Sequence, residues 1–158
     1  MSIEIIPIGG YSRIEGNSVA IKVDNEVVIL DMGLSMENYV NYQNKQTELN
    51  NGFQRRFYYE ELLLNKAVPD YNFLGDDIKN VKAVIPSHAH LDHVGAVAYG
   101  MKFFKNIPVI ATPYTIEFIK RDIKNLNYDR FFKKNNIYLK TAKLNSRVVI
   151  SEKIEVEF

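Results

Sequence analysis

The 158-residue chain has 20 Lys or Arg against 19 Asp or Glu, and 46% of its residues are hydrophobic. This balance predicts one globular domain with a single core and excludes a chain that is strongly basic or acidic throughout. The absence of cysteine excludes disulfides, thiolate metal ligands and cysteine nucleophiles, so any metal site must use His, Asp or Glu.

The first 30 residues predict three short strands. β-Branched residues dominate positions 3–8 and stop at two glycines, and apolar residues alternate over 19–23 and continue over 27–30. The pair Asp24-Asn25 suits a hairpin turn between the last two runs. Three strands so close together predict an antiparallel sheet.

The rest of the chain predicts alternating strands and helices. Residues 34–80 read as a long connection with one short helix near 54–65, which ends before Pro69. Strands are expected at 81–85, 108–111, 137–141, 147–150 and 153–158, and helices at 94–104 and from Pro113, with Thr112 as N-cap, to about Leu126. The expected fold class is therefore α/β with a partly antiparallel sheet.

The amino terminus, MSIEIIPIGGYSR, has no positively charged region before an apolar core. No run in the chain approaches the roughly 18 apolar residues that would span a bilayer. We therefore expect a soluble, cytoplasmic protein without a membrane partner.

All three histidines lie within six residues, in the stretch AVIPSHAHLDHVGA at 83–96. His88 and His90 are two positions apart, so in an extended segment both imidazoles point to one side and can bind one metal ion. If a helix begins near Asp92, then Asp92 and His93 leave in other directions and can reach a second ion. Zinc suits these ligands, with manganese or iron as substitutes. A lone histidine is usually a satisfied surface or core residue, but four ligand-type residues in six positions favour a metal site.

The histidine stretch also resembles a known family. SHAHLDH resembles the signature loop of the metallo-β-lactamase fold. Together with IEIIPIGGYSRIEGNSVAIKV and VVILDMGL, it resembles the start of an archaeal ribonuclease J, in the β-CASP group of nucleases. The resemblance covers residues 3–35 and 81–120. It departs at YSRIEGNS, where the family more often has an acidic residue and then a glycine-arginine-asparagine turn.

The resemblance implies a role for each residue of the stretch. His88 and His90 would bind one zinc ion, and Asp92 and His93 the other, with Asp92 beside the metal-bound water that attacks the phosphodiester. Asp31, which follows a strand, would fix the histidine loop by hydrogen bonding. Without the resemblance, Asp31 reads equally well as a turn residue at a strand end.

The family uses further metal ligands and a β-CASP domain that this chain lacks. No histidine follows His93, so the chain offers at most two ligands per ion, and we expect it to be inactive alone. We expect residues 1–158 to form the amino-terminal half of an αββα sandwich with an exposed apolar sheet face. A missing carboxy-terminal half or another copy of the chain would cover that face.

RNA binding has a compositional signal near the carboxyl end. Between positions 120 and 147 there are nine Lys or Arg against two Asp, interleaved with aromatic residues. The candidate RNA contacts are Lys120, Arg121, Lys124, Lys133 and Lys134. The alternative is a solvated helix face and loop whose aromatic residues belong to the core.

The sequence thus predicts a zinc-dependent ribonuclease that, as a complete enzyme, hydrolyses RNA from the 5′ end. A second hypothesis keeps the fold but changes the substrate to a thioester, a lactam or a small phosphodiester, because a fold does not fix the chemistry. A third is a noncatalytic metal-binding or partner-binding module.

Overall fold

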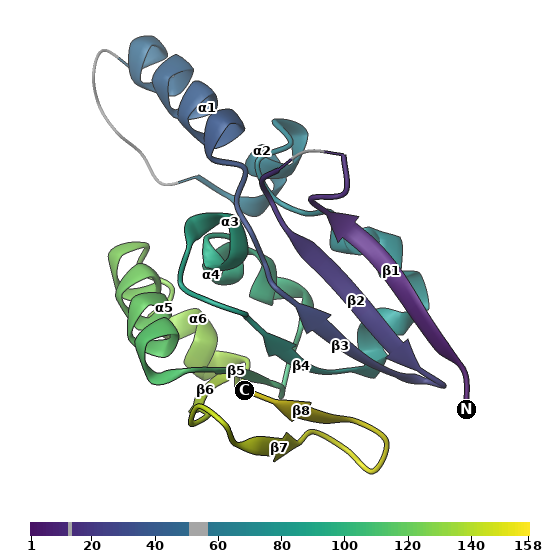
Figure 1. The fold of residues 1–158 in the computed structure, drawn as a ribbon. Coiled ribbons are helices and arrows are strands. Elements are labelled where there is room, and N and C mark those ends of the chain that lie inside the picture. The colour runs from purple at the N-terminus through teal and green to yellow at the C-terminus, as the bar shows by residue number, and fades with distance from the viewer. Residues whose placement is uncertain (13, 51–56) are drawn as a thin grey trace.

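The computed structural model describes residues 1–12, 14–50 and 57–158, and its main feature is a six-stranded sheet (Figure 1). The strands follow one another across the sheet in chain order, from β1 at one edge to β6 at the other. Their bounds are β1 Ile3–Gly9, β2 Ser18–Val23, β3 Glu26–Leu30, β4 Val81–Ile85, β5 Pro108–Ala111 and β6 Tyr138–Thr141.

The first three strands are antiparallel, and the others join in parallel, which confirms the predicted α/β class with a partly antiparallel sheet. The β2–β3 turn lies where the sequence placed it, with Asp24 in the left-handed region at φ 52°. A parallel pair needs a crossover connection, and the chain supplies it between β3 and β4 and again between later strands. The carboxyl ends of β3 and β4 therefore lie side by side, with Leu30 opposite Ile85.

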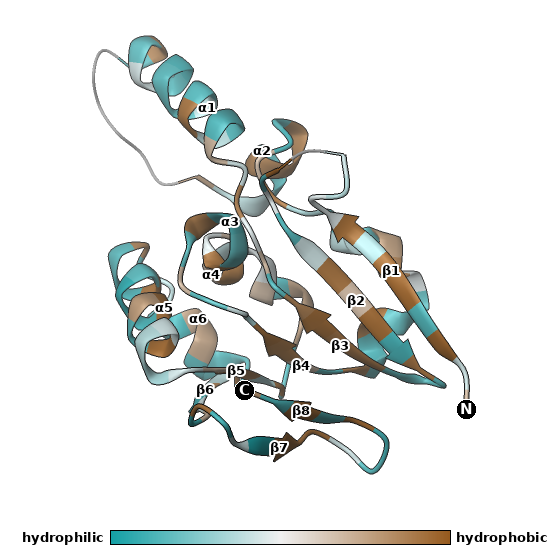
Figure 2. Cartoon of the chain, viewed as in Figure 1, coloured by the Kyte–Doolittle hydropathy of each residue, from teal (hydrophilic) through white to brown (hydrophobic). Residues whose placement is uncertain are grey.

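Both faces of the central strands are buried. Val27 and Ile29 of β3 join the large core under the helices, whereas Val28 joins a smaller core on the opposite face. The strong hydrophobic colouring of β3 and β4 in Figure 2 follows from this two-sided burial.

The helical segments are short except for two. They comprise α1 (Met36–Leu49), α2 (Tyr59–Leu64), the 3₁₀ segment η1 (Tyr71–Asn80), α3 (Leu91–Val94), α4 (Val97–Gly100), the 3₁₀ turn η2 (Met101–Phe103), α5 (Pro113–Asn125) and α6 (Asp129–Lys134). Thr112 is the N-cap residue of α5 and Pro113 its first helical residue, as predicted. The Thr112 hydroxyl bonds the Thr115 hydroxyl at 3.0 Å rather than a backbone N–H.

The prediction of one helix at 94–104 was wrong. Where α3 ends, the backbone is hydrogen-bonded to other segments: the Asp92 carbonyl accepts from Asn17 N–H, and Ala96 N–H donates to the Met32 carbonyl. In a continuous helix the Ala96 N–H would donate to the Asp92 carbonyl, so these two bonds interrupt the helix. The chain then becomes extended at Phe104.

The connection between β3 and β4 also contains more helical structure than predicted. It contains α1 and η1, neither of which was expected, and α6 was missed later in the chain. The helix predicted at 54–65 corresponds to α2, and the part of that prediction at 54–56 lies outside the described residues.

A second sheet covers part of the other face. Its two antiparallel strands, β7 (Arg147–Val149) and β8 (Glu155–Glu157), lie over the smaller core (Figure 1). Lys153 Nζ contacts Asp24 Oδ2 at 2.7 Å and so ties this hairpin to the β2–β3 turn. On β1, Ile3 and Ile5 are 60% and 69% exposed.

The α2 helix offers a matched test of the large core. Leu62 is fully buried, whereas Leu64 on the same helix is 84% exposed. We expect Leu62→Ala to lower the free energy of unfolding by about 2–5 kcal/mol, because it leaves a cavity. Leu64→Ala should change it by no more than about 0.5 kcal/mol. Urea denaturation followed by circular dichroism measures both, and equal effects would contradict this packing.

Candidate metal centre

The three histidines and Asp92 lie where β4 leads into α3. Ser87, His88 and His90 occupy the loop after β4, and Asp92 and His93 belong to the first turns of α3. The imidazole rings are close together: the His88 centroid is 4.5 Å from that of His90 and 4.1 Å from that of His93. The structure thus gathers the three predicted imidazoles on one loop.

Asp31 lies beside this loop because β3 and β4 end together. It takes the left-handed region at φ 61°, and its N–H donates to the Ile85 carbonyl at 3.2 Å. Its carboxylate contacts His93 Nδ1 at 2.8 Å and accepts from the Ser87 N–H at 2.7 Å. Asp is one of the few residues besides glycine that adopt this backbone conformation, and here these hydrogen bonds stabilise it.

The Asp31 carboxylate also reaches a second imidazole through Ser87. Ser87 Oγ donates to Asp31 Oδ1 at 2.9 Å and lies 3.0 Å from His88 Nδ1. An imidazole whose Nδ1 bonds a carboxylate is fixed as the tautomer with its Nε2 lone pair available. Asp31 therefore orients His93 directly and His88 through one hydroxyl.

Asn17 is the residue that the sequence analysis missed. Its backbone N–H donates to the Asp92 carbonyl at 3.0 Å, and its side-chain Nδ2 lies 3.2 Å from Asp92 Oδ2 and 3.3 Å from His93 Nε2. Gly33 lies against the same carbonyl, where a Cβ atom would meet Asp92 O at 1.8 Å. The only available signal was the position of Asn17 in YSRIEGNS, directly before β2.

The donor types fit zinc. Within residues 1–12, 14–50 and 57–158, no group of three or more His, Cys, Asp or Glu side chains is placed to hold one ion. The assignment of His88 and His90 to one ion and of Asp92 and His93 to another stays a prediction. Imidazole nitrogen and carboxylate oxygen are zinc ligands, and manganese or iron accept the same atoms.

A hollow of about 600 Å³ opens beside these residues. His90 and Asp92 line it from the loop and α3, Glu15 from the β1–β2 loop, and Phe118 and Arg121 from α5. We call it the metal-side hollow.

Only one of the five candidate RNA contacts lines the metal-side hollow, and that residue is Arg121. Lys120 pairs with Glu117 at 2.6 Å. Lys124 on α5 and Lys133 and Lys134 on α6 are exposed and line other parts of the surface.

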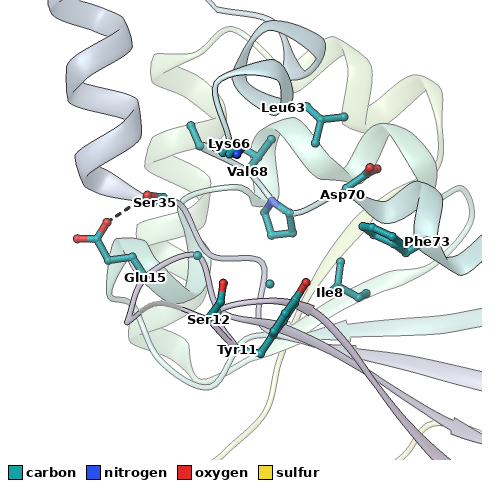
Figure 3. A pocket seen from close by; sticks show the side chains of 15 residues that line it. Ile8, Tyr11, Ser12, Glu15, Ser35, Leu63, Lys66, Val68, Asp70 and Phe73 are labelled. Atoms are coloured by element: carbon teal, nitrogen blue, oxygen red, sulfur yellow. Dashed lines mark hydrogen bonds between the residues drawn. The ribbon is translucent and has the colours of Figure 1, made fainter.

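A second recess, of about 410 Å³, lies between the β1–β2 loop and the segment after α2 (Figure 3). Glu15 lines both this recess and the metal-side hollow. Its Oε2 accepts from the Ser35 hydroxyl at 3.3 Å and from the Glu37 N–H at 3.1 Å, at the start of α1. The carboxylate thus satisfies a helix N-terminus and fixes the wall between the two hollows.

A family model for the metallo-beta-lactamase superfamily matches residues 12–149. The chain belongs to this superfamily. The match spans the Asp31 strand end, the histidine loop and α5, so the candidate metal centre lies within the matched region.

The curated relatives include ribonuclease J enzymes. The chain is 34% identical over 158 residues to ribonuclease J of Methanocaldococcus jannaschii and 32% identical over 156 residues to that of Pyrococcus abyssi. These alignments cover 100% and 99% of this chain but 33% and 32% of the two relatives. The chain thus spans about a third of the length of these relatives.

Solved structures share the metallo-beta-lactamase fold at low identity. Unliganded yeast PDE1 matches with a TM-score of 0.53 and 13% identity, over 95% of this chain and 53% of that one. The metallo-beta-lactamase fold protein YhfI from Bacillus subtilis matches with a TM-score of 0.52 and 12% identity, over 96% and 50%. No helix among the described residues has the length and apolar character needed to cross a membrane.

The Asp31 contacts predict an effect on zinc affinity. Asp31→Asn should weaken zinc binding about 10- to 100-fold, because the His93 and His88 rings lose the carboxylate that orients them. Asp76→Asn removes the same charge from a side chain that is 100% exposed, and should leave the affinity unchanged. Isothermal titration with zinc compares the two, and an equal loss would mean that only net charge matters.

Proposed function

We propose that the complete protein is a zinc-dependent ribonuclease whose metal ions are held in part by His88, His90, Asp92 and His93. The observation that carries this proposal is the gathering of three imidazoles on one loop, with Asp31 hydrogen-bonded behind them. The likeness to ribonuclease J enzymes over the whole chain supports RNA as the substrate. We further propose 5′-to-3′ exonucleolytic action and a cytoplasmic location.

The chain's own residues would prepare the site for this chemistry. Asp31 holds His93 in one tautomer, and Ser87 passes the same constraint to His88. Asn17 holds the Asp92 carbonyl and faces its carboxylate, so the orientation of Asp92 depends on the β1–β2 loop. When bound, a pair of divalent ions would supply a hydroxide at neutral pH and neutralise charge on the phosphate.

The site needs more ligands than the described residues of this chain supply. A catalytic zinc site normally has three protein ligands and one open position. Among the described residues no group of three His, Cys, Asp or Glu side chains is placed to hold one ion, and the chain spans 33% of the length of its M. jannaschii relative. We propose that the remaining ligands come from a longer form of the protein or from an associated chain.

Loss of a proposed ligand tests the function in the longest natural form of the protein. We expect His88→Ala and Asp92→Ala each to reduce cleavage of 5′-monophosphorylated RNA by about 100-fold or more, because each removes a ligand of the activating metal. Asp76→Ala, at a fully exposed carboxylate, is the control. Undiminished cleavage in both ligand variants would overturn the proposal.

A substrate panel separates the other functions. Turnover of a thioester or a lactam above that of RNA would assign a different hydrolase to the same fold. Zinc binding without hydrolysis of any panel member would instead favour a noncatalytic metal-binding module.

A further inference from the structure

The outer face of α5 carries an unusual set of side chains. The inner face of this helix buries Thr115, Ile116, Ile119 and Ile123 in the protein interior. Tyr114, Phe118 and Arg121 follow each other at spacings of four and three residues, so they lie on one face of the helix. Tyr114 is 76% exposed, and Phe118 is only partly buried. We call these three residues the α5 stripe.

The α5 stripe leads directly into the metal-side hollow. Phe118 and Arg121 line that hollow together with His90 and Asp92. The same two residues line a neighbouring hollow of about 360 Å³, whose other walls are Tyr114 and Glu117. The stripe therefore forms a continuous path along α5 to the candidate metal ligands.

The cation of the stripe, Arg121, makes no salt bridge among the described residues, although Asp122 next to it interacts with its charge. The Arg121 guanidinium lies 4.8 Å from the Phe118 ring centroid. Glu117, the acidic residue in the same hollow, is paired with Lys120. A cation over an aromatic ring presents a flat, positively charged surface with its N–H donors still available.

We propose that the α5 stripe binds single-stranded RNA and guides it to the metal ligands. Bases stack on Tyr114 and Phe118, and Arg121 binds a backbone phosphate next to the bond that is cut. The proposal rests on the ribonuclease function for its substrate. Stacking accepts any base, so this contact confers affinity without sequence preference.

The geometry favours RNA over a protein partner as the occupant. The stripe joins a hollow lined by metal ligands, and a strand that is to be cut must pass through that hollow. One exposed and one partly buried aromatic ring beside an arginine are groups of the kind that hold single strands in other proteins. A protein that covered Tyr114 and Phe118 would also close the approach to His90.

RNA binding without cleavage tests the proposal. Fluorescence anisotropy of a labelled single-stranded RNA of about ten nucleotides, a length within typical single-strand site sizes, is measured on the full chain with a chelator present. Tyr114→Ala and Phe118→Ala should each weaken binding about 10-fold. Arg121→Ala should weaken it about 5- to 10-fold and lower the slope of log affinity against log salt by about 0.7.

Two control variants are on α6. Lys133→Ala and Lys134→Ala each remove one exposed positive charge that lines neither hollow, and should change affinity less than about 2-fold. Tyr114→Phe and Phe118→Tyr keep an aromatic ring and should retain binding. Phe118→Leu keeps the apolar packing without the ring, so a loss in that variant reflects stacking rather than misfolding.

The outcomes are separable from those of the ribonuclease test. Equal losses in Lys133→Ala and Arg121→Ala would overturn the proposal in favour of diffuse charge, and unchanged binding in the Tyr114 and Phe118 variants would also overturn it. A stripe needed for the association of two protein chains but not for RNA binding overturns it in favour of a protein contact. If RNA binding depends on the stripe but the complete protein does not cleave RNA, the result supports this proposal and overturns only the proposed ribonuclease function.

Discussion

The hydrogen bonds of the Asp31 carboxylate are the interaction on which the site depends. They are possible because β3 and β4 pair in parallel and end together, which places Asp31 against the histidine loop. The left-handed backbone of Asp31 costs about 1 kcal/mol. That cost is met by a chain of bonds that reaches the core, since the Asp31 carbonyl accepts from Ser18 Oγ and Ser18 bonds the buried Tyr71 hydroxyl. The site is thus built on the centre of the sheet.

The β1–β2 loop supplies the second constraint. The Asn17 N–H donates to the Asp92 carbonyl, and the Asn17 carbonyl accepts from the Gly33 N–H. The β1–β2 loop, the turn after β3 and the start of α3 therefore meet at Asn17. A Cβ at Gly33 would overlap this contact, which explains why glycine stands there. The same bonds end α3 after one turn. The ligand loop and the interruption of the helix therefore have a common cause.

Much of the fold could be predicted from the sequence because its signals are local. Apolar alternation located the strands, and Thr112-Pro113 located the start of α5. The α1 helix was missed because its surface is mostly hydrophilic and Tyr42 is its buried residue (Figure 2). The role of Asn17, the break after α3 and the distinction of Arg121 from the nearby lysines all depend on contacts between distant segments, and no local pattern encodes these.

The position of β1 as an edge strand affects the tendency of the protein to aggregate at high concentration. One side of this strand faces no neighbour in the sheet, and two of its isoleucines are open to water. An uncovered edge of this kind can add a strand from another polypeptide, which is a route to fibres and precipitates. Pro7 has no N–H, so this strand has one backbone donor fewer than its length would give. The strand that exposes this edge is thus a different one from the central strands that carry Asp31 and the histidine loop.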